Sequence, residues 1–536
     1  MFDYESVYKN FTWPHPPNYN FARDVIDQWA ARDPGLRAMR WVDDTGQQID
    51  RTFAEMSRQS KRAANLLREA GVQRGDTVIL ILGRQIAWWE ILTACIRAGV
   101  VVSPGTTQLS AKDIAYRINA ASAVAVITDE ANARKVDSVA EESPSLKARI
   151  IVGAVREGWR SYESEMSVAD DSFEIVETST DEIALLYFTS GTTGFPKIVV
   201  HSHGYTLAHQ TTGRYWLNLE PKDLHWNISD TGWAKAAWSS YFGPWHQGAS
   251  IFVHHTSGFD SSMVLSLLQR QPISTLCAAP TVYRMLVLKD LAACSFPCLR
   301  DCVGAGEPLN PEVIAQWRQA TGITIRDGYG QTESVILCGA FPALEVRPGS
   351  MGKPAPGIDL QVIDDDGTIQ PAGKEGDIAV RVKPNHPLGL FRGFRNSVKQ
   401  AQACFREEWY ITGDRAYRDS DGYFWFVGRA DDVILSSGYR IGPFEVESAL
   451  IEHPAVAEAA VVSSPDEVRG EIVKAFVVLA PGFAPTATLS TELQEHVKRV
   501  TAPYKYPRRI EFVAELPKTV SGKIRRVELR NREWGR

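Results

Sequence analysis

The sequence predicts an α/β protein: a large N-terminal domain with parallel-type sheets flanked by helices, a β-rich subdomain, and a small mobile α+β C-terminal domain. The main observation is that helical and strand-like patterns alternate through the first third of the chain, which is typical of parallel sheets covered by helices. The second is size, because 536 residues with 44% hydrophobic content exceed one core and supply apolar area for two or three domains.

Six segments in the first third of the chain carry this alternation. The predicted helices are Phe53 to Ala70, which Gly71 is expected to end, Ile86 to Arg97, and Ala111 to Ala120. The predicted strands are Thr77 to Leu82, Val100 to Ser103, and Ala123 to Thr128. Ligands of such sheets bind beyond the carboxyl ends of the strands, so the loops that follow strands are where a site is expected.

A domain boundary is predicted near residue 430, which gives domains 1–430 and 431–536. Before it, a glycine-rich β passage runs from Gly349 to Phe426, with hairpin signals at Asp366-Gly367 and Asp421-Gly422. The unit after the boundary is predicted to contain helices Pro443 to Glu452 and Thr491 to Val500, and strands Val456 to Ser463, Ile472 to Leu479 and Ile510 to Leu516.

Charge and hydropathy argue against several classes of partner. The net charge is −6, from 58 basic against 64 acidic residues, which favours neither nucleic acid nor an anionic membrane. The longest apolar runs fall far short of the ~20 residues that a membrane span requires, so a soluble protein is expected. Residues Met1 to Lys9 include Asp3 and Glu5 and no apolar stretch, so the expected location is cytoplasmic.

Seven cysteines in this length of chain do not make a disulfide framework. Cys294, Cys298 and Cys302 recur every four residues, which would suit a metal site on a helix. Pro297 interrupts any such helix, and no histidine or second cysteine pair completes a tetrahedral set. Small thiols beside a strand are the favoured interpretation.

The most informative stretch follows the apolar run Ile183 to Phe188, which is suited to a buried strand. It consists of Thr189, Ser190, Gly191, Thr192, Thr193 and Gly194, with Lys197 shortly after. Such residues present backbone N–H groups and hydroxyls to an anion, and the lysine adds positive charge. Pro196 and Ile198 flank Lys197, which excludes a Walker A loop. A plain surface loop is the alternative when the stretch is read alone.

Further segments share an unusual density of glycine, aromatic and polar residues. They are Val303 to Leu309, Asp327 to Glu333 (Asp-Gly-Tyr-Gly-Gln-Thr-Glu), Trp409 to Asp414 with Gly428 to Arg429, Ser437 to Gly442, and Leu516 to Lys523 (Leu-Pro-Lys-Thr-Val-Ser-Gly-Lys). The segment that begins at Asp327 fits neither a helix nor a strand and is suited to a binding loop. Lys518 and Lys523 lie in a Pro/Ser/Gly loop, so packing requires neither of them.

Together these segments resemble the signatures of the adenylate-forming superfamily, which comprises acyl-CoA synthetases, adenylation domains of peptide synthetases, and luciferases. The resemblance covers most of the chain and is nearest to the medium-chain acyl-CoA synthetases. It implies ATP, Mg²⁺ and coenzyme A as cofactors and a small carboxylic acid as substrate.

The resemblance implies roles for the nucleotide site. Residues expected to contact the nucleotide are Gly306, Glu307, Pro308, Asp327, Gly328, Tyr329, Gly330 and Gln331, besides the loop that begins at Thr189. Thr332 is expected to reach the α-phosphate and the substrate carboxylate, and Glu333 to position Mg²⁺. Asp414 and Arg429 are expected to clamp the ribose from two sides.

The resemblance also implies roles for the C-terminal domain. Lys523 is expected to be the catalytic lysine and Asp431 the hinge about which the domain rotates between the two half-reactions. Residues expected to contact nucleotide or coenzyme A are Ser437, Gly438, Tyr439, Arg440, Arg469, Lys498, Tyr506 and Arg508.

The predicted function is ATP-dependent activation of a carboxylic acid to acyl-AMP, followed by transfer to CoA. Acetate-specific relatives carry Trp at the position of Gly330, so an open pocket is expected here, with Trp233, Trp238 and other aromatic residues nearby, for a medium-chain, branched or aromatic acid. Two alternatives are the same activation with another acceptor, and a silent nucleotide-binding protein. A homodimer, and modification of Lys523 by a lysine acetyltransferase and deacetylase, are left open.

Overall fold

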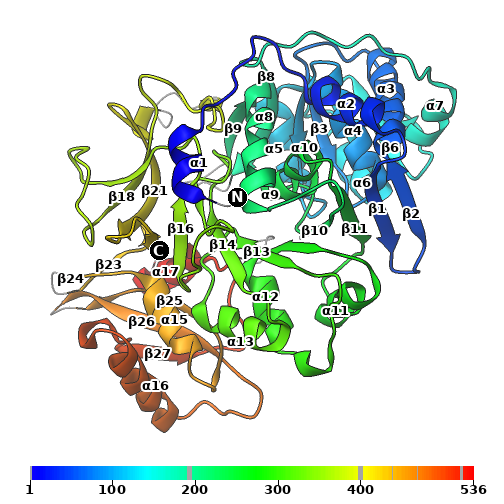
Figure 1. Cartoon of the computed structure of the whole chain (residues 1–536). Helices are drawn as coiled ribbons and strands as arrows, with labels where there is room; N and C mark the ends of the chain where they lie inside the picture. The colour runs from blue at the N-terminus through cyan, green and yellow to red at the C-terminus, as the bar shows by residue number, and fades with distance from the viewer. Residues whose placement is uncertain are drawn as a thin grey trace.

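The computed structural model of the chain describes residues 3–189, 196–395, 402–436, 439–466, 469–518 and 523–535. Over these ranges the chain forms three sheets with helices packed against them (Figure 1). Two sheets belong to a large body, and the third belongs to a smaller C-terminal unit at the lower left of the view. The predicted α/β class is therefore confirmed.

The first sheet contains the strand that precedes the predicted phosphate loop. Its described strands in spatial order are β19 (Phe394–Arg395), β9 (Lys197–Ser202), β8 (Ile183–Thr189), β4 (Val101–Pro104), β3 (Thr77–Ile81), β5 (Ala123–Asp129), β6 (Ala148–Val152) and β7 (Arg160–Ser161). Neighbouring strands from β8 to β7 in this order are parallel to each other. Strand β9 is antiparallel to both of its neighbours, β8 and β19.

The helices of this region follow the sequence pattern closely. They are α2 (Gln28–Arg32), α3 (Phe53–Glu69), α4 (Ile86–Arg97), α5 (Ala111–Ala121), α6 (Glu130–Asp137) and α7 (Tyr162–Val168). Thr52 begins α3 with a capping box, in which its hydroxyl accepts from Glu55 N and Glu55 accepts from Thr52 N. Gly71 follows its end in the left-handed region, at φ +83°, as predicted.

The second sheet joins a parallel half to an antiparallel half. Its described strands in spatial order are β17 (Leu360–Ile363), β18 (Glu375–Arg381), β21 (Trp409–Arg418), β22 (Phe424–Arg429), β16 (Ser350–Pro354), β15 (Cys338–Gly339), β14 (Ile325–Tyr329), β13 (Asp301–Ala305), β12 (Thr275–Ala278), β10 (Leu224–Ile228), β11 (Ser250–His255), β1 (Arg37–Asp43) and β2 (Gln48–Thr52), with β20 (Phe405–Arg406) beside β21. Every neighbouring pair of strands from β14 to β1 in this order is parallel.

Further helices belong to this half of the large body. They are α8 (His203–Thr211), α9 (Ala234–Ala237), α10 (Gly243–His246), α11 (Ser261–Arg270), α12 (Pro280–Val287) and α13 (Pro311–Thr321). The first helix, α1 (Tyr4–Asn10), lies beside β16, far away in sequence (Figure 1). Tyr4 OH donates to Pro354 O at 2.8 Å and Tyr8 OH to Ile358 O at 3.0 Å, which ties the N-terminus to the β-rich subdomain.

The two predicted hairpin signals have different outcomes. Asp421-Gly422 joins β21 to β22 with Gly422 at φ +87°, as predicted. At Asp366-Gly367 the chain also turns, but it closes a small bridge between Ile363 and Ile369 before β18 begins at Glu375.

The C-terminal unit has its own sheet and core. Its described strands are β24 (Tyr439–Ile441), β23 (Ile434–Ser436), β26 (Gly470–Leu479) and β25 (Val456–Asp466), with β27 (Arg509–Phe512) parallel to β26. Its helices are α15 (Pro443–Ile451), α16 (Ala487–Val500) and α17 (Arg526–Trp534). The proposed boundary at residue 430 falls between β22 and β23.

Three details of this unit differ from the sequence prediction. Helix α16 begins at Ala487 rather than Thr491, because the Thr486 hydroxyl accepts from Leu489 N and caps an earlier turn. Strand β27 ends at Phe512 rather than Leu516, since β26, its partner, ends at Leu479. Helix α17 was not predicted, because its apolar periodicity is weak and Leu529 is its one fully buried residue among those described.

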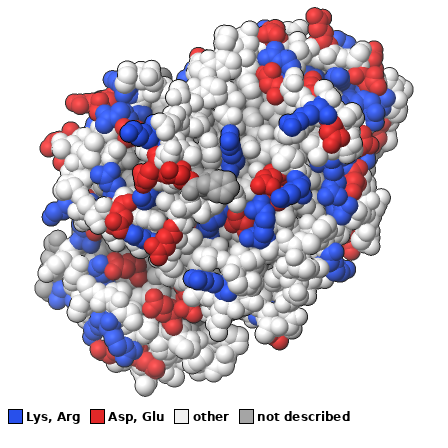
Figure 2. Space-filling view, in the orientation of Figure 1, with Lys and Arg blue, Asp and Glu red and all other residues white. Residues whose placement is uncertain are grey.

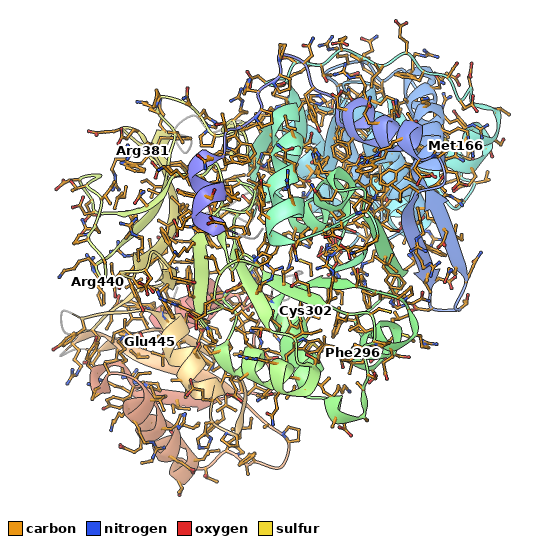
Figure 3. The ribbon with its side chains drawn as sticks, in the orientation of Figure 1. Met166, Phe296, Cys302, Arg381, Arg440 and Glu445 are labelled. Atoms are coloured by element: carbon orange, nitrogen blue, oxygen red, sulfur yellow. The ribbon has the colours of Figure 1, made fainter. Side chains whose placement is uncertain are left out.

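Neither the surface charge nor the cysteines indicate a further binding site in the described part of the chain. Figure 2 shows basic and acidic side chains interspersed over this face. In the described part of the chain, no helix combines the length and the apolar character needed to cross a membrane. Cys302 is buried within β13 (labelled in Figure 3), whereas Cys298 is exposed. Across the described ranges, no three His, Cys, Asp or Glu side chains cluster as metal ligands.

Candidate active site

The ends of four parallel strands build the site. Strands β10, β12, β13 and β14 are neighbours, and Ala305 at the end of β13 pairs with Gly328 of β14. Because parallel strands end at one edge, the segments that follow them meet there. These segments are Ser229–Lys235, Pro280–Thr281, Gly306–Pro308 and Gly330–Glu333. The predicted loop positions are thus brought together by the sheet.

Two cavities open at this edge and meet there. One, of about 1050 Å³, is lined by Trp233, Trp238 and Lys235, and the other, of about 780 Å³, by Asp414, Arg429 and Glu333. Both sizes suit small-molecule ligands. The residues that line both cavities are Gly306, Glu307, Gly330, Gln331, Thr332 and Lys523. The two cavities therefore adjoin each other at these residues, beside Lys523.

Asp414 is the centre of a hydrogen-bond network in the smaller cavity. Its Oδ2 accepts from Tyr329 OH and from Gln331 Nε2, both at 2.6 Å, and its Oδ1 lies 3.1 Å from Arg429 Nη1. Tyr410 OH donates to Gln331 Oε1 at 3.1 Å and so holds that amide in place. Asp414 therefore also has a structural role, because it fastens the Tyr329–Gln331 turn to β21.

A bulge directs Asp414 into the cavity. The register between β18 and β21 shifts between the pairs Asp377–Arg415 and Ala379–Ile411, so β21 contains extra residues there. Gly413 takes up the bend with φ +75°, a conformation that glycine adopts without a Cβ penalty. The glycine before the aspartate therefore marks a bulge within the strand.

The predicted phosphate loop connects two paired strand ends. Thr189 ends β8 opposite Lys197 at the start of β9, and Lys197 Nζ lies 5.3 Å from the centre of the Phe394 ring. Both residues line the smaller cavity together with Glu333. Ser190, Gly191, Thr192, Thr193 and Gly194 lie outside the described residues. Burial raises the pKa of Glu333, and a cation beside this carboxylate would reverse that effect.

The Gly306–Pro308 turn is anchored through Glu307. Thr281 N donates to Glu307 Oε1 at 2.9 Å and Arg284 Nη2 to Oε2 at 3.3 Å. Burial alone would raise the pKa of Glu307, but Arg284, Thr281 and Lys523 together hold it below its ordinary value. Glu307 is therefore an ionised anchor that attracts the lysine.

Lys523 reaches the junction from the C-terminal domain. Its Cε lies 4.0 Å from the position that a Cβ on Gly306 would take. Although part of the side chain is open to the cavities, the surrounding protein lowers the pKa of Lys523 below the ordinary lysine value. Glu307 and Asp414 act in the opposite sense by attracting the ammonium group.

The Asp327–Gly328 pair has a structural basis that the sequence did not reveal. A Cβ on Gly328 would lie 2.4 Å from Trp216 Cε2, so packing against Trp216 requires glycine. Burial raises the pKa of Asp327 to about 7, and one of its oxygens accepts from Gly328 N at 2.8 Å. Nearby Asn310 caps α13 through its Oδ1, while its Nδ2 makes no hydrogen bond to any described residue. This buried donor lines the smaller cavity.

The acid pocket differs from the prediction at Gly330. A Cβ there would lie 2.6 Å from Trp238 Cη2 and 2.7 Å from Val335 O, so the space expected to be open is filled by Trp238. Trp238 is held in place because its Nε1 donates to Tyr205 OH at 2.8 Å. The larger cavity extends instead past Trp233.

The other aromatic residues of this segment belong to the core. Tyr241 OH lies 2.7 Å from Thr93 Oγ1, and Trp245 Nε1 donates to Ala38 O at 3.0 Å. Neither these two nor Phe242 lines either cavity, whereas Trp233 and Trp238 line the larger one. Trp238 begins the π-helix Trp238–Phe242, and aromatic residues close in sequence are therefore divided between pocket and core.

The basic residues expected to contact CoA lie away from both cavities. Arg440 is exposed on β24 and lies at the outer edge of the C-terminal unit (labelled in Figure 3). Lys498 Nζ and Arg508 Cζ lie 4.2 and 4.8 Å from the Tyr506 ring, and the exposed rings of Tyr439 and Tyr504 stack at 4.3 Å. Arg469 lies in the turn directly before β26. Ser437 and Gly438 lie outside the described residues.

Three contributors to the site were not predicted from the sequence. Lys235, Arg284 and His201 carry no local motif, and only the fold brings them to the junction. His201 Nε2 donates to Thr332 O at 2.7 Å, and burial lowers the pKa of His201 to about 3, so the ring is neutral. The one signal available was Lys235, an isolated charge within an aromatic and apolar run.

The strand-edge loops, the Asp414–Arg429 pair and a lysine delivered by a second domain define an enzyme of the adenylate-forming class. A model described as AMP-binding enzyme matches residues 26–394, and one described as AMP-binding enzyme C-terminal domain matches residues 445–523. The chain belongs to the AMP-binding enzyme family. The acyl-coenzyme A synthetase ACSM3, mitochondrial, of Homo sapiens is 51% identical over 542 residues, covering 99% of this chain and 92% of that protein.

Solved structures of acid–CoA ligases share the whole fold. The anthranilate CoA ligase AuaEII in complex with anthranoyl-AMP has a TM-score of 0.90 at 31% identity, with 97% of this chain and 98% of that chain covered. A benzoate CoA ligase from Burkholderia xenovorans LB400 has a TM-score of 0.84 at 28% identity, with 96% and 100% covered. The resemblance drawn from the motifs is confirmed.

The prediction of a cytoplasmic protein is wrong. The similar acyl-coenzyme A synthetases ACSM3, ACSM4 and ACSM5 are all named mitochondrial. The residues that fold into an enzyme do not indicate its compartment, because a targeting segment specifies the compartment and is separate from the fold.

Proposed function

We propose that this enzyme activates a medium-chain, branched or aromatic carboxylic acid with ATP and transfers the acyl group to coenzyme A. The observation that carries the proposal is the junction of the two cavities at Thr332 and Lys523. An acid in the larger cavity and a nucleotide in the smaller one would meet beside a lysine. The relatives named as acyl-coenzyme A synthetases and as anthranilate and benzoate CoA ligases support this acid class.

The smaller cavity fits a nucleotide with its metal. Asp414 and Arg429 offer an acceptor and donors for ribose hydroxyls, and Asn310 Nδ2 is a buried donor for a base. Glu333 would hold Mg²⁺, which typically binds one or two carboxylates together with substrate phosphates and neutralises their charge. Its raised pKa fits a carboxylate that awaits a cation.

In the first half-reaction a carboxylate oxygen attacks the α-phosphorus of ATP, and the bond from that phosphorus to the pyrophosphate oxygen breaks. This step requires stabilised negative charge rather than a covalent protein nucleophile. Lys523 and the Thr332 hydroxyl would stabilise the charge, and Gly306 would let the lysine approach. The acid's carbon chain would lie along Trp238 and Trp233.

In the second half-reaction the CoA thiol attacks the acyl carbon, loses its proton, and AMP leaves. CoA must reach the carbon that Lys523 covers, so the C-terminal domain would rotate about Asp431. The stacked Tyr439 and Tyr504, with Arg440, Lys498 and Arg508, offer an aromatic and basic surface that suits the phosphates and adenine of CoA.

A substrate screen tests this function. Pyrophosphate release and AMP formation are measured with ATP, Mg²⁺ and straight-chain, branched and aromatic acids, with and without CoA. We expect AMP turnover that requires both an acid and CoA, and its loss when Mg²⁺ is chelated. Multiple turnover without CoA would point to another acceptor, and no acid-dependent pyrophosphate release would overturn the proposal.

A further inference from the structure

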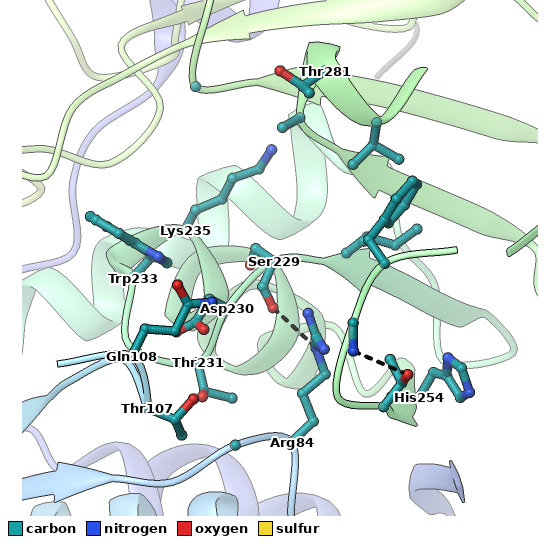
Figure 4. A pocket seen from close by; sticks show the side chains of 18 of the residues that line it. Arg84, Thr107, Gln108, Ser229, Asp230, Thr231, Trp233, Lys235, His254 and Thr281 are labelled. Atoms are coloured by element: carbon teal, nitrogen blue, oxygen red, sulfur yellow. Dashed lines mark hydrogen bonds between the residues drawn. The ribbon is translucent and has the colours of Figure 1, made fainter. Parts of the chain in front are cut away.

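Lys235 is a cation of the large body that reaches the cavity junction. It lies at the start of α9, directly after Trp233 and Ala234, and its Nζ donates to Ala305 O at 2.6 Å. Figure 4 shows the side chain extending across the larger cavity toward the segment that contains Thr281. The hydrogen bond fixes the ammonium group at the carboxyl end of β13.

Two lysines thus flank one turn. Lys235 binds the carbonyl of Ala305, while Lys523 lies over the next residue, Gly306. They come from different domains, since Lys235 is fixed to the sheet and Lys523 is delivered by the C-terminal unit. Burial lowers the pKa of Lys235, Cys277 opposes this shift, and the neighbouring Lys523 lowers the pKa further.

Lys235 has no carboxylate partner among the described residues, since none of their salt bridges includes it. An ammonium group has three N–H donors, and within the described chain Ala305 O accepts one of them. Glu307 and Asp327 attract the ammonium group without forming a salt bridge with it among the described residues, so a ligand that supplies negative charge directly would stabilise this half-buried cation. The cavity that Lys235 lines also contains Gly330 and Thr332, where the proposed acid would react.

We propose that Lys235 binds the carboxylate of the acid substrate and, after activation, the carbonyl oxygen of the acyl group. This inference rests on the proposed function. Because Lys235 belongs to the large body, it stays in place when the C-terminal domain rotates. Lys235 therefore serves both half-reactions, whereas Lys523 serves adenylation alone.

Lys235→Gln separates this role from a structural one. Glutamine keeps an N–H donor, one bond closer to the backbone, but carries no charge, so loss of a purely structural lysine would not act on the acid alone. We expect KM for the acid to rise about tenfold to a hundredfold, the range for a hydrogen bond to a charged group, while KM for ATP stays unchanged. Lys235→Arg, which keeps the charge, should recover part of the loss.

The half-reactions provide a second readout. Transfer of a preformed acyl-adenylate to CoA is measured for Lys235→Gln, Lys235→Met and Lys523→Ala. Both Lys235 variants should slow this transfer, and Lys523→Ala should largely preserve it. Lys222→Met is the matched control, because Lys222 pairs with Glu220 on the surface and lines neither cavity. It should behave like the unchanged enzyme.

Two results would overturn the inference. One is a wild-type KM for the acid in Lys235→Gln; the other is an equal rise of KM for acid and ATP, which would indicate general damage to the site. Melting temperatures of all variants identify any loss of folding. If the unchanged enzyme itself shows no acid- and CoA-dependent AMP formation, the proposed function fails, which is a separate outcome.

Discussion

At the scale of single residues, the surroundings of Lys523 bear on its proposed role in adenylation. The surrounding protein and Arg429 lower the pKa of Lys523, whereas Glu307 and Asp414 attract its ammonium group. Lys523 lies beside Gly306 of the large body but belongs to the C-terminal domain. The effect of Lys523 on the reaction rate should therefore depend on the orientation of the C-terminal domain.

Lys523→Ala is expected to lower the rate of adenylation by at least about 10²–10³, the typical cost of one preorganised charge stabiliser. Transfer of a preformed acyl-adenylate to CoA should be largely retained. Single-turnover measurements of each half-reaction check this. An equal loss in both would contradict a lysine that leaves the site, and Lys222→Ala, at the Glu220 ion pair on the surface, is the control.

Gly330→Ala is expected to lower kcat/KM for all acids together. The new Cβ would lie 2.6 Å from Trp238 Cη2 and 2.7 Å from Val335 O, and the backbone atom cannot move aside cheaply. The measurement is kcat/KM for acetate, butyrate, hexanoate and benzoate. A selective loss of the longer acids alone would show that Gly330 sets the depth of the pocket after all.

At the scale of elements, the connection between β22 and β23 is where the two units meet. Asp432 N donates to Arg429 O at 3.0 Å, and Arg530 of α17 pairs with Asp432 at 2.8 Å while also donating to Asp431 O. The C-terminal helix thus fastens the connection in the observed orientation, in which Lys523 lies at the junction. The proposed rotation of the domain would require a change of backbone conformation close to Asp431.

Asp431→Pro is expected to preserve adenylation and slow acyl transfer to CoA, because proline fixes φ near −65° and restricts the residue before it. Both half-reactions are measured, with Asp431→Ala as a control that removes the carboxylate but not the backbone freedom. Normal transfer with crippled adenylation would count against rotation about this residue.

At the scale of the whole molecule, buried histidines make stability depend on pH. Burial lowers the pKa of His201 and His225 to about 3 and of His203 and His246 to about 4, and that of His209 falls well below 6.5. Between these values and 6.5 the unfolded chain binds more protons than the folded one. The free energy of unfolding therefore falls as the pH falls through that window.

We expect each such histidine to cost about 1.4 kcal/mol of stability per pH unit below its unfolded value. Melting temperatures measured between about pH 7.5 and about pH 5 should fall steeply. His225→Gln, which removes one buried ring, should flatten that slope. The exposed His15, replaced in His15→Gln, is the control. An unchanged slope in His225→Gln would refute the account.

Sequence alone determined the class of the protein. The alternation of helix and strand follows from short-range patterns, and α4 spans Ile86–Arg97 as predicted. The residues of the binding loops form contiguous motifs such as Asp327 to Glu333. Both signals are local, so they can be read without knowing the fold. The domain that supplies Lys523 was likewise visible as a separate α+β pattern.

Only the tertiary structure decided what surrounds those motifs. Trp238 fills the space beside Gly330, and Asp414 is fastened by Tyr329 and Gln331 across a bulge. Lys235 reaches the junction because β10 and β13 end at the same edge, although seventy residues separate it from Ala305. These contacts join residues far apart in the chain, and no local pattern encodes a distance that only the packing of parallel strands creates.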